Sequence, residues 1–153
     1  MIRRALQNTS VLSALALILA TIAFTKWGYF WYAMLLDDIW QVLIGRTEAE
    51  LIALSERRGF LQTFNSWFIS FVQACGLLAL IRMTQAKTLF RYLLVALISG
   101  AFMVIPALGN AVLFAGQSSP LWGLDSVHFL CGYLGMALVF WLTLEWGPSR
   151  VKA

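Results

Sequence analysis

The chain has 153 residues, of which 61% are hydrophobic and 12% are charged, and its formal net charge at pH 7 is +4. A soluble domain is about 45–50% apolar and about 25% charged, and a chain of this length could not hide so much apolar surface in one core. The composition therefore excludes an ordinary water-soluble protein, and the mean hydropathy of +0.80 indicates a membrane protein. The basic residues are scattered rather than clustered, which argues against nucleic acid as a partner.

The first apolar stretch covers residues 11–32 and follows the basic opening "MIRRALQNTS". That opening resembles the start of a signal peptide, but no small-x-small cleavage site follows the apolar stretch. About 20 apolar residues are enough to cross a bilayer. We therefore expect a retained first transmembrane helix.

The one long segment between apolar stretches covers residues 33–63 and contains "DDIWQVLIGRTEAELIALSERRGF". Thr47 followed by Glu50 makes a capping box, and Gly59 is a suitable helix stop, so we expect a short helix from about Glu48 to Arg58. The preceding "MLLDDIWQVLI" is too apolar for water and fits an amphipathic stretch along the outer interface. This segment could be a lid or docking surface, but no motif in it names a partner, which favours a packed connector.

Three more apolar stretches follow at about 64–81, 92–116 and 122–146. The connections "RMTQAKTLFR" and "GQSSP" are short, and short connections force neighbouring helices to run in opposite directions. The predicted fold is an all-α integral membrane protein with a single membrane domain over residues 1–153. Its core is an antiparallel four-transmembrane-helix bundle, with the short amphipathic helix on the outer side between the first two spans. Pro106 inside the third span should disturb that helix.

Lysine and arginine predict the orientation, because they are enriched in cytoplasmic loops. With the N-terminus inside, the inner side carries Arg3, Arg4, Arg82, Lys87, Arg91, Arg150 and Lys152. The outer side carries most of the acids and only three arginines, with Lys26 near the boundary. We expect both termini in the cytoplasm. The pattern suits a bacterial inner membrane, and an endoplasmic reticulum protein would look much the same.

Polar residues within the spans supply the candidate site, because they are costly in lipid and therefore informative. Asp125 and His128 share one helix face at positions i and i+3. Asn110 and His128 each lie six residues from the outer end of a span, about 9 Å deep at ~1.5 Å per residue. Gln73 and Lys26 fall in the same outer half. These five residues predict a polar, ligand-binding cavity that opens to the outer face.

Two interpretations of Asp125 and His128 remain open. In the catalytic one, Asp125 orients His128, which accepts or donates a proton. In the structural one, the pair joins helices by hydrogen bonds, and Asp125 is an acid in the first turns of the last helix, favoured there by the helix dipole. Structural networks of this kind are common, which favours the structural interpretation.

The remaining reactive side chains give weaker signals. Cys75 and Cys131 are far apart in sequence and match neither a disulfide framework nor a zinc site. A single histidine with no second ligand is poor evidence for a metal. We therefore expect inert thiols, no metal and no cofactor. Gly132 and Gly135 should allow close packing of the last helix.

Three functions follow from these features. The lack of a catalytic motif favours a non-catalytic protein that binds a lipid-like ligand, or a membrane-protein partner, through its outer half. That partner could be a second copy of the chain. The alternative is a membrane-embedded enzyme that acts on a lipid, sterol or quinone-like substrate through Asp125 and His128. An oligomeric transporter or channel is the third, although the inner half offers few polar groups for a path.

Overall fold

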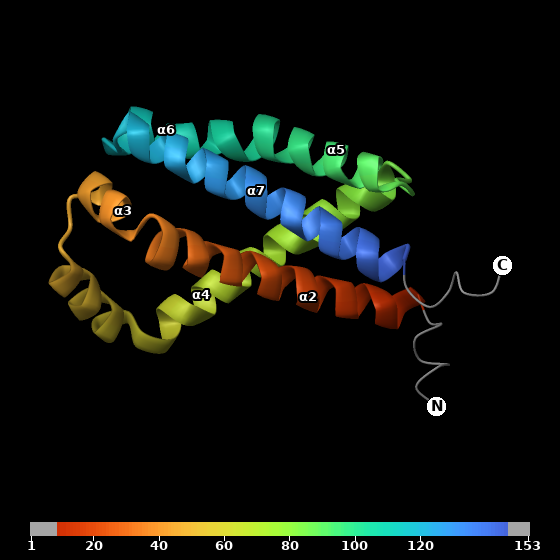
Figure 1. Cartoon of the computed structure of the whole chain (residues 1–153), viewed down its shortest axis with the longest axis horizontal. Helices are drawn as coiled ribbons and strands as arrows, with labels where there is room; N and C mark the ends of the chain where they lie inside the picture. Colours follow the sequence, from red (N-terminus) through yellow and green to blue (C-terminus); the bar gives the residue numbers. More distant parts are fainter. Residues whose placement is uncertain (1–8, 147–153) are drawn as a thin grey trace.

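The computed structural model describes residues 9–146, and every regular element in that range is a helix, which confirms the predicted all-α class. The elements are α2 (Thr9–Phe30), the π-helical turn η1 (Trp31–Leu35), α3 (Asp37–Ile44), α4 (Glu48–Met83), α5 (Leu89–Ser99), the π-helical turn η2 (Gly100–Val104), α6 (Ile105–Ala115) and α7 (Ser119–Leu144). Figure 1 labels the α-helices among them.

Four helical stretches are long and apolar enough to cross a membrane. They are Ser10–Leu35, Glu48–Met83, Leu89–Ala115 and Ser119–Leu144. Each overlaps one of the four predicted spans, and the second is the longest because α4 begins well before the predicted residue 64. The boundaries of the other three lie within a few residues of the predicted ones.

The extra length of α4 comes from two helices that meet at Gly59. The capping box predicted at its start is present: the hydroxyl of Thr47 accepts from the backbone N–H of Glu50, and the Glu50 carboxylate accepts from the backbone N–H of Thr47. Gly59 has φ +47° and ψ −128°, which is not helical. The predicted helix break at Gly59 is therefore confirmed, but as a kink within α4 rather than as the end of a separate helix.

The third stretch is irregular just before Pro106. The π-helical turn η2 separates α5 from α6, and Pro106 lies in the first turn of α6. Proline lacks the N–H that would continue an α-helical ladder, and a wider turn accommodates that loss. The expected disturbance at Pro106 therefore takes the form of a π-helical turn on its N-terminal side.

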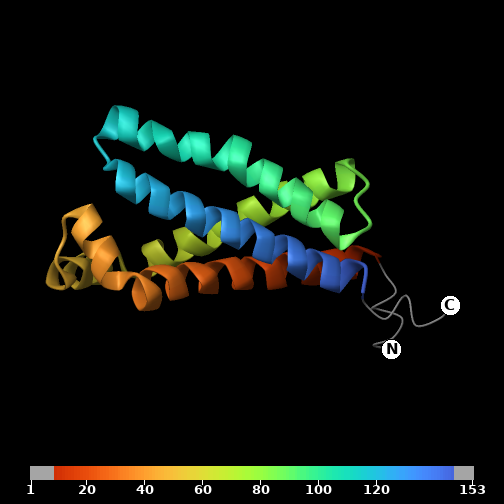
Figure 2. The same ribbon diagram turned by 45° about the horizontal axis from the view of Figure 1, so that its top comes forward.

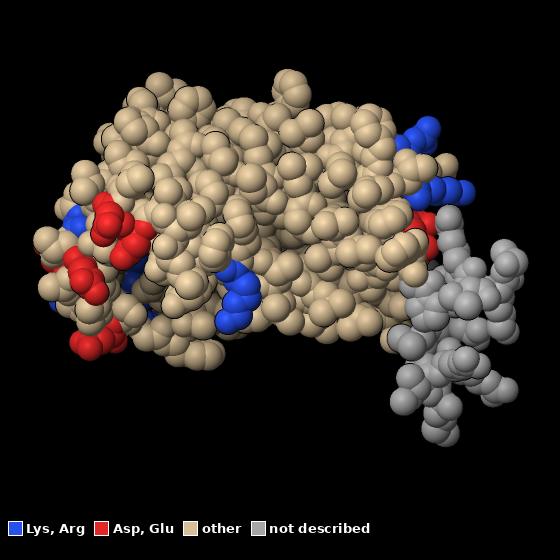
Figure 3. Space-filling model, in the orientation of Figure 1, with Lys and Arg blue, Asp and Glu red and all other residues tan. Residues whose placement is uncertain are grey.

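The elements are arranged along one long axis. In Figures 1 and 2, the ends of α2 and α7 nearest the chain termini lie beside the α4–α5 connection, at what we call the terminal end. α3 and the α6–α7 connection lie at the opposite end, which we call the α3 end. Figure 3 shows acidic side chains gathered at the α3 end. It shows basic side chains at the terminal end and, on the face drawn, a wide surface between them that is uncharged apart from a small basic patch.

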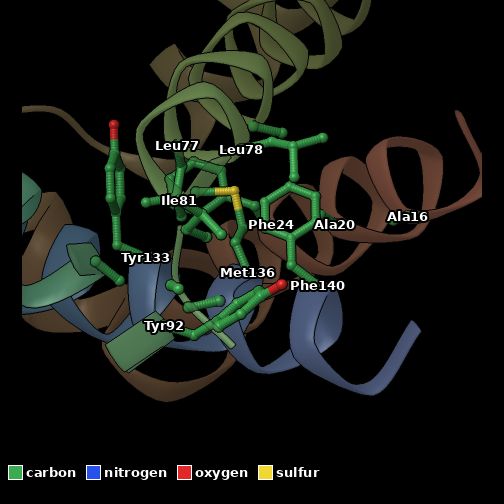
Figure 4. Close-up of a cluster of buried hydrophobic side chains, with 14 residues drawn as sticks. Ala16, Ala20, Phe24, Leu77, Leu78, Ile81, Tyr92, Tyr133, Met136 and Phe140 are labelled. Atoms are coloured by element: carbon green, nitrogen blue, oxygen red, sulfur yellow. The ribbon is translucent and has the colours of Figure 1, made fainter. Parts of the chain in front are cut away.

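The core lies in the half of the molecule nearer the terminal end (Figure 4). Its largest fully buried side chains are Leu77, Ile81, Met136 and Phe140. In α4 the buried residues begin at Ser70, so only the last part of this helix packs into the bundle. The earlier part of α4 leaves the bundle and exposes apolar side chains.

Candidate functional site

His128 lies in α7 and is enclosed by aromatic rings. Its side chain is 4% exposed. The ring centroids of five aromatic residues lie 4.8–6.4 Å from that of the imidazole. They are Phe24, Trp27, Trp31, Tyr32 and Phe129, and together with His128 we call them the His128 cluster. Four of the five come from α2 and η1, so the cluster forms where the first helical stretch meets the last.

Contacts with the backbone hold this interface together. The indole N–H of Trp27 donates to the carbonyl oxygen of His128 at 3.0 Å. The Trp27 and His128 rings are nearly parallel, with an angle of 1° between their planes. A Cβ placed on Gly28 would lie 3.5 Å from His128 Nε2, so the imidazole packs directly against the α2 backbone. An added methyl group at position 28 would make an ordinary van der Waals contact with the imidazole.

Asp125 is hydrogen-bonded to Tyr32 rather than to His128. The phenol of Tyr32 donates to Asp125 Oδ1 at 2.7 Å, and the Gln117 side-chain amide donates to Oδ2 at 3.3 Å. The Tyr32 ring also lies closest to the imidazole, with centroids 4.8 Å apart. Tyr32 therefore bridges the two predicted site residues, and it links η1 to α7.

Three polar atoms in the His128 cluster lack a hydrogen-bond partner among residues 9–146. Both imidazole nitrogens and the indole nitrogen of Trp31 are buried in this way. Asp125 therefore does not orient His128 through a hydrogen bond, as the catalytic interpretation expected. The proton-transfer role of the pair stays a prediction.

The other three predicted ligand-binding residues lie apart from this network. Lys26 and Asn110 are exposed on α2 and α6. Gln73 on α4 is half-buried, and its Oε1 has no hydrogen-bond partner within the described part of the chain. None of the three contributes to the hydrogen bonds that hold Asp125, so the five residues do not form one hydrogen-bonded group in the described structure.

The cysteines give no sign of a shared site. Cys75 is half-buried, Cys131 is exposed, and both thiols are free. Within residues 9–146, no group of three or more histidine, cysteine and acidic side chains is placed to hold a metal ion.

A groove lies between α2 and α4 where α4 leaves the bundle. It has a volume of about 310 Å³, within the range of small-molecule sites. We call it the α2–α4 groove. It is lined by Ile18, Thr21, Phe64, Trp67, Phe68 and Phe71. These side chains are almost entirely apolar, and Thr21 satisfies its own hydroxyl by donating to the Leu17 carbonyl at 2.8 Å. The groove can therefore accept hydrocarbon but offers little to a polar ligand.

Sequence analysis did not predict this groove or the aromatic walls around His128. Phe60, Phe64 and Phe68 recur every four residues in α4, and their rings stack with centroids 5.9 and 6.2 Å apart. That spacing places them on one helix face, so the aromatic side of the groove was visible in the sequence. No local pattern predicted that Tyr32 and Gln117 bind Asp125. Tyr32 is 93 residues away from Asp125 in sequence, and Gln117 lies in the connection before α7.

Comparison with known families gives one match. The family described as "Protein of unknown function (DUF1761)" matches residues 15–141, which is most of the chain, so the chain belongs to this family. No curated protein and no solved structure matches. The matched range includes both the His128 cluster and the α2–α4 groove.

Proposed function

We propose that this member of the DUF1761 family crosses a lipid bilayer four times and binds a lipid-like molecule without converting it. Four long apolar helices support membrane insertion. Large apolar side chains such as Phe102, Leu113 and Phe114 are exposed on the third stretch. In water they would be costly, whereas in a bilayer they would contact acyl chains.

The proposed topology has four antiparallel spans with both termini in the cytoplasm of a bacterium, the protein lying in the inner membrane. The terminal end carries Arg82, Lys87 and Arg91, and the α3 end carries most of the acids. This polarity agrees with the positive-inside rule. The basic residues predicted near the two termini lie outside the described residues, so the topology rests on the loop charges.

α3 and the first part of α4 would then lie along the outer surface. α3 begins with Asp37 and Asp38 and exposes Ile39 and Val42. A short helix with acids at its start and exposed apolar side chains suits the boundary between head groups and hydrocarbon. In this role the segment is a connector between the first two spans.

The α2–α4 groove is the observation that carries the binding proposal. It is open, apolar and lined by four aromatic residues from α4. An acyl chain matches it in chemistry, because dispersion contacts and apolar burial are all that the lining offers. Acyl chains also surround a membrane protein at high concentration, so even weak preference would keep the groove filled.

A ligand in the α2–α4 groove would lie apart from the polar cavity expected from sequence, because the two share no residue. That cavity would use Lys26, Gln73, Asn110, Asp125 and His128. An enzyme that relies on Asp125 and His128 would need these two side chains to meet, and Tyr32 stands between them. A binding protein requires no such contact, which is why we favour it over the enzyme. A transporter is disfavoured for another reason, namely the few polar groups that the sequence places in the inner half.

A photo-crosslinking experiment tests the groove. The protein is reconstituted in nanodiscs with a phospholipid whose acyl chain carries a diazirine, irradiated, and digested for peptide mass spectrometry. We expect crosslinks to concentrate on the α4 peptide that contains Phe64 and Phe68. Phe114 on α6 is exposed to the surroundings and serves as the reference for annular lipid.

Two tryptophan substitutions on α2 make the test specific. Ile18→Trp fills the groove, because Ile18 is exposed and lines it. Leu19→Trp adds the same side chain one residue on, at another exposed position outside the lining. Ile18→Trp should reduce crosslinking to α4 severalfold while Leu19→Trp leaves it unchanged. Equal crosslinking at Phe64 and Phe114, unaffected by Ile18→Trp, would contradict the proposal.

A further inference from the structure

The His128 cluster contains more unpaired hydrogen-bonding capacity than a packed interior tolerates. A neutral imidazole always presents one N–H donor and one acceptor nitrogen, and here both nitrogens are buried without a partner among the described residues. The Trp31 indole N–H is unpaired as well, and its ring centroid lies 6.2 Å from that of His128. Native proteins pair nearly all such atoms, so a concentration of exceptions points to a missing partner.

We propose that the His128 cluster is a second binding site, which takes a neutral planar ring that carries carbonyl or hydroxyl oxygen. Phe24, Tyr32 and Phe129 surround the imidazole with aromatic surface, and aromatic rings favour a planar partner in stacked or edge contact. A carbonyl oxygen on that ring would accept from the N–H of His128 or of Trp31, and a hydroxyl could also donate to the acceptor nitrogen of the imidazole. This inference goes beyond the acyl-chain function, because the site lies between α2, η1 and α7 rather than in the α2–α4 groove.

The proposed ligand is neutral because, among the described residues, the His128 cluster itself includes no lysine, arginine or carboxylate to pair with a charged one. The nearest carboxylate, Asp125, already accepts from Tyr32 and Gln117 through its two oxygens. A charged ring would have to leave water for an aromatic enclosure without a compensating charge, which is strongly unfavourable. A neutral ring oxygen has only to exchange its hydrogen bonds with water for those with His128 and Trp31.

Trp31 is the ring that can move to admit the ligand. Trp27 is fixed by its hydrogen bond to the His128 carbonyl, and Tyr32 is fixed by its bond to Asp125. The Trp31 indole has no such bond within residues 9–146, and it begins the π-helical turn η1. Such turns occur often at functional sites. Rotation of Trp31 would open the cluster without breaking a hydrogen bond that holds the helices together.

The single histidine makes a direct test practicable. With ¹⁵N-labelled histidine and an affinity tag free of histidine, the imidazole of His128 gives the only two side-chain nitrogen signals. The full chain in nanodiscs is titrated with decylubiquinone, a benzoquinone with a decyl tail. The control is decylbenzene, which has the same tail on a ring without oxygen. We expect saturable shifts of the imidazole nitrogens with decylubiquinone alone.

Matched variants separate hydrogen bonding from packing. Trp31→Phe keeps an aromatic ring and removes the N–H, so binding should weaken roughly fivefold, as expected for one neutral hydrogen bond. Trp40→Phe is the control, because Trp40 also packs on Tyr32 but belongs to α3. Binding by Trp40→Phe should equal that of the unaltered chain. Ile18→Trp should also leave decylubiquinone binding unchanged, so that failure of this site and failure of the groove are told apart.

Three outcomes would overturn the inference. One is equal shifts with decylbenzene, which would mean partition into the bilayer without recognition of oxygen. Another is an imidazole already hydrogen-bonded before titration and unmoved by it, which would mean a resident water. The third is equal binding by Trp31→Phe and the unaltered chain.

Discussion

At the residue scale, two glycines of α7 that look equivalent in the sequence have different roles. Gly132 and Gly135 were both expected to allow close packing. A Cβ on Gly132 would lie 2.3 Å from a ring carbon of Phe24, closer than real atoms approach. A Cβ on Gly135 would meet nothing within 4 Å among the residues described. Only Gly132 therefore sets the distance between α2 and α7.

This difference predicts opposite effects of one substitution at the two positions. Gly132→Ala should lower the free energy of unfolding by about 1–3 kcal/mol, because the buried Phe24 ring must shift within a packed core. Gly135→Ala should be neutral or raise it by up to about 1 kcal/mol, because alanine favours the helix. Denaturation of both variants in mixed micelles, followed by tryptophan fluorescence, measures the effect. Equal stability of the two variants would contradict the observed contact.

At the element scale, α4 combines two helices with different surroundings. The part after Ser70 is anchored in the core, whereas the part before Gly59 makes its own capping box and has no buried residue. Gly59 joins them with a backbone conformation that residues with a side chain rarely adopt. The direction of the part of α4 before Gly59, relative to the part after it, depends on this residue.

Substitution of this glycine is predicted to be costly, again with a control on the same helix. Gly59→Ala should destabilise the protein by about 1–3 kcal/mol, because alanine is strained at positive φ. Gly76 lies in the α-helical part of α4, and a Cβ added there would have no neighbour within 4 Å in the described chain. Gly76→Ala should therefore be neutral or slightly stabilising. Thermal unfolding in detergent compares them. If Gly59→Ala were as stable as Gly76→Ala, the kink would not be a fixed feature of the fold.

At the scale of the whole molecule, the charged side chains gather at the two ends of the long axis. The terminal end is mainly basic, the α3 end is largely acidic, and the face drawn in Figure 3 is mainly uncharged between them. A bilayer would favour this division, because charged groups are costly in hydrocarbon and basic loops tend to stay on the cytoplasmic side. The long axis of the bundle would then lie across the membrane.

Cysteine labelling at the two ends of α4 tests this orientation. In a background of Cys75→Ala and Cys131→Ala, single cysteines are introduced at Ser55 and at Thr84, both exposed. An impermeant maleimide added to intact bacteria should label Ser55→Cys directly and Thr84→Cys only after lysis. The reverse pattern would mean inverted insertion, and labelling of both in intact cells would contradict a spanning α4.

Features that depend on short stretches of chain could be predicted from the amino-acid sequence. Apolar runs of about 20 residues marked the four helices that are long and apolar enough to cross a membrane, because length and hydropathy are local properties. The capping box at Thr47 and the break at Gly59 were predictable for the same reason: both involve backbone groups only a few residues apart. Sequence analysis also selected His128 and Asp125 as the unusual polar groups of the last span.

The side chains that surround those groups could not be predicted from sequence, because most of them come from distant parts of the chain. Tyr32 reaches Asp125, and Trp27 reaches His128, across about a hundred residues of sequence. Such contacts depend on how α2 and α7 are rotated about their own axes. A helix that is apolar on all sides carries no stripe to fix that rotation from sequence. The rotation is set instead by how individual side chains fit together, such as Phe24 against Gly132, and those contacts exist only once the helices have packed.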